Sequence, residues 1–298
     1  MSRPLRIELP DGLYHVTSRG DRREPIFEDD DDRELLLDVL AQGLERFDAS
    51  VFAYCLMGNH YHFVLQTRKG NLSRLMRHVN GVYSQSYNRR RGLVGHLFQG
   101  RFKAIHVDAD AYFLAVCRYV ELNPVRARIA DEPGRLRWSS YRAHLGIDSV
   151  PPWLDSEALY GYLIGQDVET AEDVSRARAL YEQFVCDGLN DRLWERELRQ
   201  DIYLGETAFI QRIQMSMSRA QASSKEIPAA QSRVPAAMPA IPRESTPREM
   251  LMRQAFVESG CSLSSIAREW NLSVSRVSRL IKRAEDKIRS ARDGIYDA

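Results

Sequence analysis

Cysteine is scarce in this chain, and long apolar runs are missing. The 298 residues include four cysteines, at positions 55, 117, 186 and 261, and none of them forms a C-x-x-C pair. We therefore expect reduced thiols in a cytoplasmic protein without a structural zinc. No apolar run approaches a membrane span, and the first residues lack the apolar core of a signal peptide, so we expect no membrane partner and no secretion.

Acidic residues are absent between Arg68 and Lys103, although the net charge of the whole chain is only +1. This stretch contains nine lysines and arginines, and the aromatic residues between them are Tyr83, Tyr87, Phe98 and Phe102. A charge run is usually a solvated face, but the added aromatics favour phosphate neutralisation and base stacking on single-stranded nucleic acid. The candidate DNA-binding residues here are Arg89, Arg90, Arg91, Arg101 and Lys103. The acidic run 28–32, in contrast, is typical of the first turn of a helix, so we expect a cap and a solvated face there and no metal site.

Two histidines, His60 and His62, stand two residues apart in an apolar and aromatic run. Residues i and i+2 of a strand point to the same face, so the two imidazoles would lie side by side and form half of a metal site. The alternative is an ordinary polar alternation on a surface strand. The other histidines lack such a spacing and are predicted to be structural; they are His15, His78, His96, His106 and His144.

Tyr119 and Asn123 lie four residues apart in an amphipathic segment and would share one helix face. Pro124 disfavours regular helix at Asn123 and predicts an end or kink there. The alternative for Tyr119 is an ordinary core aromatic. Neighbouring Arg118, Arg126 and Arg128 favour an anionic partner, and Arg126 is a candidate DNA-binding residue.

Five motifs follow one another in the first half of the chain, namely Tyr14-His-Val-Thr-Ser-Arg19-Gly, Met57-Gly-Asn-His60-Tyr-His62, Phe98-Gln-Gly-Arg101-Phe-Lys103, Tyr119-Val-Glu-Leu-Asn123-Pro124-Val-Arg and Trp138-Ser-Ser-Tyr141. In this order they resemble the HUH single-tyrosine transposases, and within them the REP-associated tyrosine transposases. Several motifs in the right order are far more specific than any one of them.

The resemblance implies roles for individual residues. His60 and His62 would bind a divalent metal, Mg²⁺ or Mn²⁺, and Asn123 would be the third ligand at a position where family members often have Gln. Tyr119 would attack a phosphodiester of single-stranded DNA, giving a covalent 5′-phosphotyrosine and a free 3′ hydroxyl without a nucleotide cofactor. Arg19 in the first motif is a further DNA-binding candidate.

Patterning predicts an α+β fold for residues 1–147. Strands are expected at 13–19, 51–57, 60–66 and 102–107, and helices at 32–47, 72–90 and 111–129. This order suits a ferredoxin-like antiparallel sheet with helices on one face, which is the HUH nuclease core. A helical accessory region should follow at 148–217, and the Ala-, Ser-, Gln- and Pro-rich stretch 218–246 is predicted to be a flexible linker.

The last segment, 247–298, carries a second pattern that indicates DNA binding. Apolar residues at helical spacing occur on both sides of a turn at Asn271-Leu-Ser273, which resembles a helix-turn-helix domain. A small helical hairpin for oligomerisation is the alternative. The basic residues expected on the recognition helix are Arg276, Arg279, Lys282 and Arg283.

Two classes of function therefore compete. One is an endonuclease and strand transferase acting on single-stranded hairpin DNA, with duplex affinity added by the C-terminal domain. The other is a non-catalytic DNA-binding regulator on the same fold. Intact His60, His62 and Tyr119 favour the first. A third and less favoured hypothesis is an HUH replication initiator. The Asn123-Pro124 motif after the tyrosine and the small core favour the transposase type. The target sequence and the oligomeric state stay open.

Overall fold

The computed structural model describes residues 8–189, 191, 198–199, 202–206, 208–213, 247–257 and, apart from 268, 273–275, 278 and 282, residues 266–284. The chain divides into two compact units. The larger spans Arg6–Leu198 with Ile202–Leu204, and the smaller contains the residues from Gly205 onward. The linker predicted at 218–246 lies outside the described residues.

The larger unit is built on a sheet whose main strands are β1 (Gly12–Arg19), β2 (Ala49–Leu56), β3 (His60–Thr67) and β4 (Lys103–Val107). They lie in the order β2-β3-β1-β4, with each neighbouring pair antiparallel. This is the ferredoxin-like order, which places β1 and β3 in the centre.

A short strand outside the predicted set changes the edge of the sheet. β6 (Tyr203–Leu204) pairs with β4 in the parallel direction, and β5 (Leu198–Arg199) follows it in the sheet order. The sheet is therefore mixed, and the expectation of a purely antiparallel sheet was wrong at this edge. A two-residue strand far along the chain is too short to leave a period-2 pattern.

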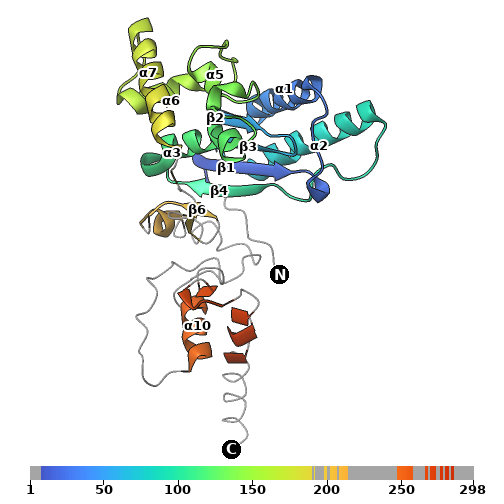
Figure 1. Ribbon diagram of the computed structural model, residues 1–298, viewed down its shortest axis with the longest axis vertical. Helices are drawn as coiled ribbons and strands as arrows, with labels where there is room; N and C mark the ends of the chain where they lie inside the picture. Colours follow the sequence, from blue (N-terminus) through green and yellow to red (C-terminus); the bar gives the residue numbers. More distant parts are fainter. Residues whose placement is uncertain are drawn as a thin grey trace, which may run out of the picture. The chain divides into compact units, whose positions relative to one another are not determined.

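Two long helices, α1 (Asp30–Phe47) and α2 (Leu72–Arg91), cover one face of the sheet (Figure 1). Asp29 caps α1 by accepting a hydrogen bond from the Asp32 amide at 3.0 Å, as the acidic run predicted. Gly92, in the left-handed region with φ 66°, ends α2.

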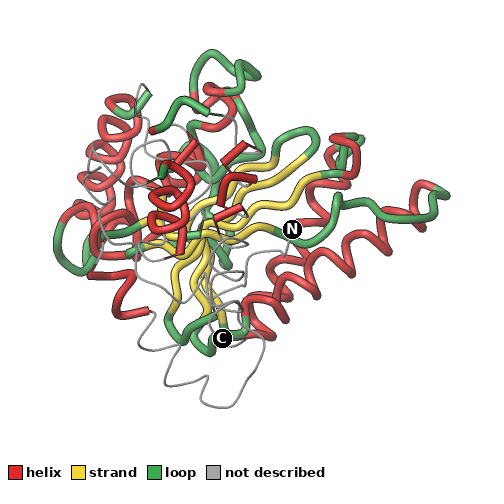
Figure 2. The backbone as a smooth tube through the Cα atoms, turned by 90° about the horizontal axis from the view of Figure 1, so that it is seen from below, coloured by secondary structure: helices red, strands yellow, loops and turns green. Residues whose placement is uncertain are grey.

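Further helices pack on the opposite face, so the strands lie between two helical layers (Figure 2). They are α3 (Ala109–Glu121), α4 (Asn123–Arg126), α5 (Tyr141–His144), α6 (Ser156–Ile164) and α7 (Ala171–Asp187). The expectation of helices on one face only was therefore wrong. Helices cover both faces because consecutive residues of β2 and β3, which point to opposite faces, are buried. Short 3₁₀ turns occur at Asp21–Arg23 and Pro133–Arg135.

The accessory region predicted at 148–217 contributes α6 and α7 to the same apolar cluster as α3. It also supplies β5 and β6, and residues 208–213 are helical. Expected as helical throughout, the region thus adds strands to the sheet as well.

In the smaller unit, α10 (Arg248–Val257) and described residues on both sides of a turn at 270–271 share one small apolar cluster. Arg276, Arg279 and Arg283 are exposed, whereas Lys282 lies outside the described residues. The helix-turn-helix remains a prediction. No helix in the described part of the chain is both long and apolar enough to cross a membrane.

Candidate histidine and tyrosine site

The β2–β3 hairpin sets the positions of the two paired histidines. The Met57 amide donates to the His60 carbonyl at 2.8 Å and closes the turn around Gly58-Asn59. His60 begins β3, and His62 follows on the same face, as predicted from the spacing. Their ring centroids lie 5.1 Å apart with an interplanar angle of 70°.

Asn59 fixes the proton of His60. Its amide nitrogen donates to the Arg23 carbonyl at 2.8 Å, so its oxygen faces the His60 ring, 2.7 Å from Nδ1. Because that oxygen only accepts, Nδ1 carries the proton and Nε2 keeps a lone pair.

A third histidine, His15 of β1, belongs to the same cluster. Its Nε2 lies 2.9 Å from Nδ1 of His62, and the two ring planes are parallel within 4°. Its ring also meets Tyr119 edge-on at a centroid distance of 5.8 Å. The sequence predicted a structural role for His15, since nothing in its spacing signals this contact. Only the strand register, which pairs His15 with Val64 and makes His62 its diagonal neighbour, brings it here.

All three imidazoles are held in the neutral form. Burial lowers the pKa of His15 to about 3. Burial, and then the charge of Arg19, lowers the pKa of His60 to about 4. Burial first, and then the charges of His15, His60 and Arg19, holds the pKa of His62 well below its usual range. Neutral imidazoles carry the lone pairs that a metal requires.

Tyr119 lies near the end of α3, with the Arg126 guanidinium 4.8 Å from its ring centroid. Arg126 also donates to the carbonyls of Gly188 at 3.2 Å and Asp191 at 2.9 Å. Burial lowers the pKa of Arg126, while attraction to Tyr119 and Asp191 opposes that shift. Predicted to contact DNA, Arg126 thus sits against the tyrosine and the segment after α7.

Asn123 lies at the point where the helix breaks. α3 ends at Glu121, Leu122 caps it, and α4 begins at Asn123, consistent with the effect expected of Pro124. The Asn123 amide nitrogen donates to the carbonyls of Tyr119 at 3.0 Å and Val120 at 3.3 Å. Within the described residues it makes no hydrogen bond to His60 or His62, so the structure brings Tyr119 to the histidine cluster but does not join Asn123 to it.

A divalent metal needs several donor atoms that converge on one point. Among the described residues, no group of three or more His, Cys, Asp or Glu side chains can hold a metal ion. The Nε2 atom of His62, however, is buried and has no hydrogen-bond partner in the described part of the chain. A buried nitrogen lone pair without a donor is unfavourable unless a ligand satisfies it. The two Nε2 atoms therefore fit half of a metal site.

The predicted DNA-binding residues of the larger unit fall into two groups. Arg19, Arg89, Arg101 and Lys103 are exposed, and Arg19 pairs in register with His60. Arg90 and Arg91 instead make ion pairs with the acidic run, including Arg91 with the buried Asp32 at 2.7 Å. Their charges are largely neutralised within the protein, so the assignment of both to DNA is not supported by their contacts.

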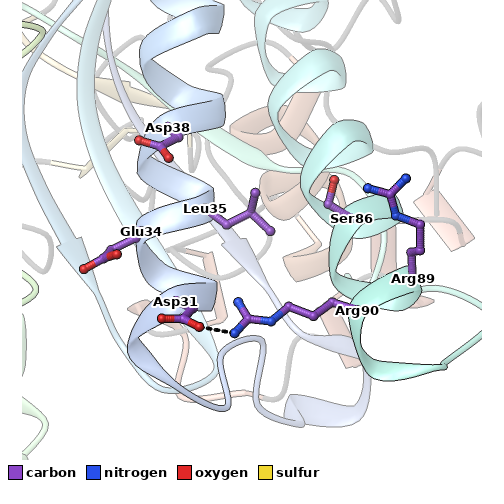
Figure 3. A pocket seen from close by; sticks show the side chains of 7 residues that line it. All are labelled: Asp31, Glu34, Leu35, Asp38, Ser86, Arg89 and Arg90. Atoms are coloured by element: carbon purple, nitrogen blue, oxygen red, sulfur yellow. Dashed lines mark hydrogen bonds and ion pairs between the residues drawn. The ribbon is translucent and has the colours of Figure 1, made fainter.

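A hollow of about 570 Å³ lies between α1 and α2, away from the histidine cluster. Figure 3 shows its lining, in which Arg90 reaches across from α2 to Asp31 of α1. The other lining residues are Glu34, Leu35, Asp38, Ser86 and Arg89. Its mixed charges compensate one another, and none of the histidine or tyrosine candidates lines it.

The aromatics of the basic stretch are core residues. Tyr83 is 0%, Tyr87 3%, Phe98 8% and Phe102 6% exposed. Their interpretation as platforms for stacked bases was wrong, because Tyr83 and Tyr87 occupy the inward face of α2, four residues apart.

A buried carboxylate two residues after Tyr119 was missed from the sequence. Glu121 is fully buried and accepts hydrogen bonds from three other segments. The donors are Ser140 Oγ at 2.5 Å, His144 Nδ1 at 2.7 Å and the Tyr181 hydroxyl at 2.8 Å. The signal was a glutamate flanked by Val120 and Leu122 on an apolar helix.

Residues 9–123 match the family described as "Transposase IS200 like". This part of the chain, which contains β1 to β4, both paired histidines and Tyr119, is therefore similar to the IS200-like transposases.

Two solved structures are similar to the chain. One is a REP-associated tyrosine transposase bound to a REP hairpin, with 16% identity, a TM-score of 0.43, and coverage of 51% of this chain and 89% of that chain. The other is a candidate transposase from Deinococcus radiodurans R1, with 16% identity, a TM-score of 0.30, and coverage of 40% of this chain and 96% of that one. No curated protein matches the chain.

Proposed function

We propose that this protein is a metal-dependent endonuclease and strand transferase that cleaves and rejoins single-stranded hairpin DNA through Tyr119. The observation that carries the proposal is the continuous set of contacts from His60 through His62 and His15 to Tyr119. It joins two neutral nitrogen donors to a hydroxyl nucleophile. The match of residues 9–123 to the IS200-like transposase family supports it.

His60 and His62 would hold the metal through Nε2, and Asn123 would add its amide oxygen as a third ligand. A bound Mg²⁺ or Mn²⁺ supplies positive charge that polarises the phosphodiester. Exposed Arg19, beside the histidine pair in the sheet register, would bind the phosphate backbone together with Arg101 and Lys103.

Tyr119 would act as the nucleophile. Its phenolic oxygen attacks phosphorus, and the bond from phosphorus to the 3′ oxygen of the DNA breaks. The phenol loses a proton and the leaving 3′ oxygen takes one up, which gives a 5′-phosphotyrosine and a free 3′ hydroxyl. The Arg126 cation against the ring favours the phenolate. The phosphotyrosine conserves the bond energy, so rejoining needs no nucleotide cofactor.

The test is incubation of the full chain with a labelled library of hairpin oligonucleotides and Mn²⁺, followed by denaturing separation of covalent adducts. We expect adducts with the natural sequence, none with His60→Ala or His62→Ala, and a smaller loss with Asn123→Ala, because water can partly replace an amide oxygen. Full activity of either histidine variant in excess chelator would overturn the metal site. A larger defect in Asn123→Ala than in both histidine variants would overturn the ligand ranking. Tight hairpin binding without any adduct would support the DNA-binding regulator instead.

A further inference from the structure

We propose that His15 is a positioning residue, which accepts the Nδ1 proton of His62 and thereby keeps the Nε2 lone pair of His62 directed to a divalent cation. This inference rests on the proposed function and deepens it. It assigns a third histidine to the site through its action on a ligand, without direct contact with the metal.

The contact between the two rings is a hydrogen bond with two possible directions. Nε2 of His15 and Nδ1 of His62 lie 2.9 Å apart, and the ring planes are parallel within 4°. One nitrogen must therefore donate and the other accept.

The far side of the His62 ring distinguishes the two directions. If His15 donated, His62 would carry its proton on Nε2, a buried atom that has no acceptor among the described residues. An N–H there cannot bind a metal. If His62 donates, Nε2 carries a lone pair, so a cation can bind at Nε2 only when the hydrogen bond runs from His62 to His15.

The fold holds His15 in place for this role. It is 4% exposed and lies on a central strand, where its backbone pairs with Val64 of β3 and Ile105 of β4. The same ring touches the edge of Tyr119 at 5.8 Å between centroids. One side chain therefore sets both the orientation of a ligand and its separation from the tyrosine.

The experiment measures Mn²⁺ binding to the full chain, without DNA, from the electron paramagnetic resonance signal of free Mn²⁺. His15→Phe keeps a ring and removes the acceptor, whereas His15→Gln places an amide oxygen near the position of Nε2. The matched control is His106→Phe. His106 is also buried on a strand, but it packs on Tyr14, whose side chain points to the opposite face from that of the adjacent His15.

We expect His15→Phe to weaken Mn²⁺ binding about 10- to 100-fold, as loss of an outer-shell partner does. His15→Gln should stay within a few-fold of the natural sequence, and His106→Phe should bind normally. Unchanged affinity in His15→Phe, with binding lost in His62→Ala, would overturn this inference while the proposed function stands. Unchanged affinity in His62→Ala would overturn both.

A second measurement needs no folded His15 variant. Imidazole ¹⁵N shifts of the metal-free natural protein report which nitrogen of His62 is protonated, with the resonance identified by its absence from His62→Ala. The proposal requires the proton on Nδ1. A proton on Nε2 would overturn it.

Discussion

At the scale of single residues, spacing in the sequence was enough to predict the histidine pair but not its third member. The i and i+2 relation of His60 and His62 depends only on strand geometry, and the two rings lie 5.1 Å apart as that geometry requires. His15 was missed because its contact depends on the register between two strands about fifty residues apart, which one sequence does not reveal. Arg90 and Arg91 were predicted to bind DNA from their charge alone. They form ion pairs with acidic residues at the start of α1, and a basic side chain can do this as readily as it binds phosphate.

His106 gives a prediction about pH at this scale. Burial lowers its pKa in the folded state from 6.5 to about 4. The unfolded chain therefore binds the extra proton between these values, so this residue makes the protein less stable as the pH falls from about 6.5 to about 4. Within that window the slope from one such group is about 1.4 kcal/mol per pH unit.

His106→Phe should flatten the pH dependence of the free energy of unfolding in the same window, because a phenyl ring still packs on Tyr14 and does not titrate. Urea titrations of metal-free protein at four pH values between 4 and 7 measure it. Parallel curves for the variant and the natural sequence would contradict the assignment.

At the scale of helices and strands, local sequence pattern predicts the ranges of most elements but not all of their packing. Strands β1 to β4 and helices α1 and α2 lie within a few residues of the predicted ranges, because each has a clear period. The parallel β4–β6 pair depends on a two-residue strand that is too short to leave a local pattern. The face of the sheet on which α3, α6 and α7 pack depends on tertiary contacts, which the period of a helix does not specify.

The buried carboxylate of Glu121 links α3, the helix that carries Tyr119, to three other segments. Glu121 joins α3 to Ser140, to His144 of α5 and to Tyr181 of α7, so the tyrosine is held partly by residues outside the 9–123 segment. This network also accounts for the Trp138-Ser-Ser-Tyr141 motif, since the Ser140 hydroxyl donates to Glu121 and accepts from the Tyr54 amide on β2 at 2.9 Å.

Glu121→Ala should lower the free energy of unfolding by about 3 to 5 kcal/mol, because it leaves three buried donors without their acceptor. Glu182→Ala is the control. Glu182 is exposed on α7, and its loss should change the same quantity by less than about 0.5 kcal/mol. Urea unfolding of both variants at pH 7 makes the comparison, and equal midpoints would show that the network does not hold the helix.

At the scale of the whole molecule, the histidines and Tyr119 lie in one compact unit, and the basic residues of the C-terminal segment lie in the other. The two units divide between residues 198 and 205. α6 and α7, which follow residue 147, share an apolar cluster with α3. The domain boundaries at 147 and 217 stay predictions.

Truncation after Met217 should keep cleavage of short single-stranded hairpins and lose affinity for duplex DNA. Each lost phosphate contact should reduce the slope of log affinity against log salt by about 0.9 on duplex DNA. Filter binding at four salt concentrations compares both chains. An unchanged slope and affinity would assign the terminal residues to oligomerisation or to another partner.

The central claim is that Tyr119 forms the covalent bond to DNA, and Tyr119→Phe tests it most directly. The phenyl ring keeps the contacts with His15 and Arg126 and removes only the nucleophilic oxygen. A hairpin labelled at its 3′ end, incubated with Mn²⁺ and separated under denaturing conditions, should be retained by the natural sequence and by the control Tyr112→Phe on the same helix. Tyr119→Phe should give no adduct while binding the hairpin within a few-fold, and an adduct that persists in Tyr119→Phe would contradict the account.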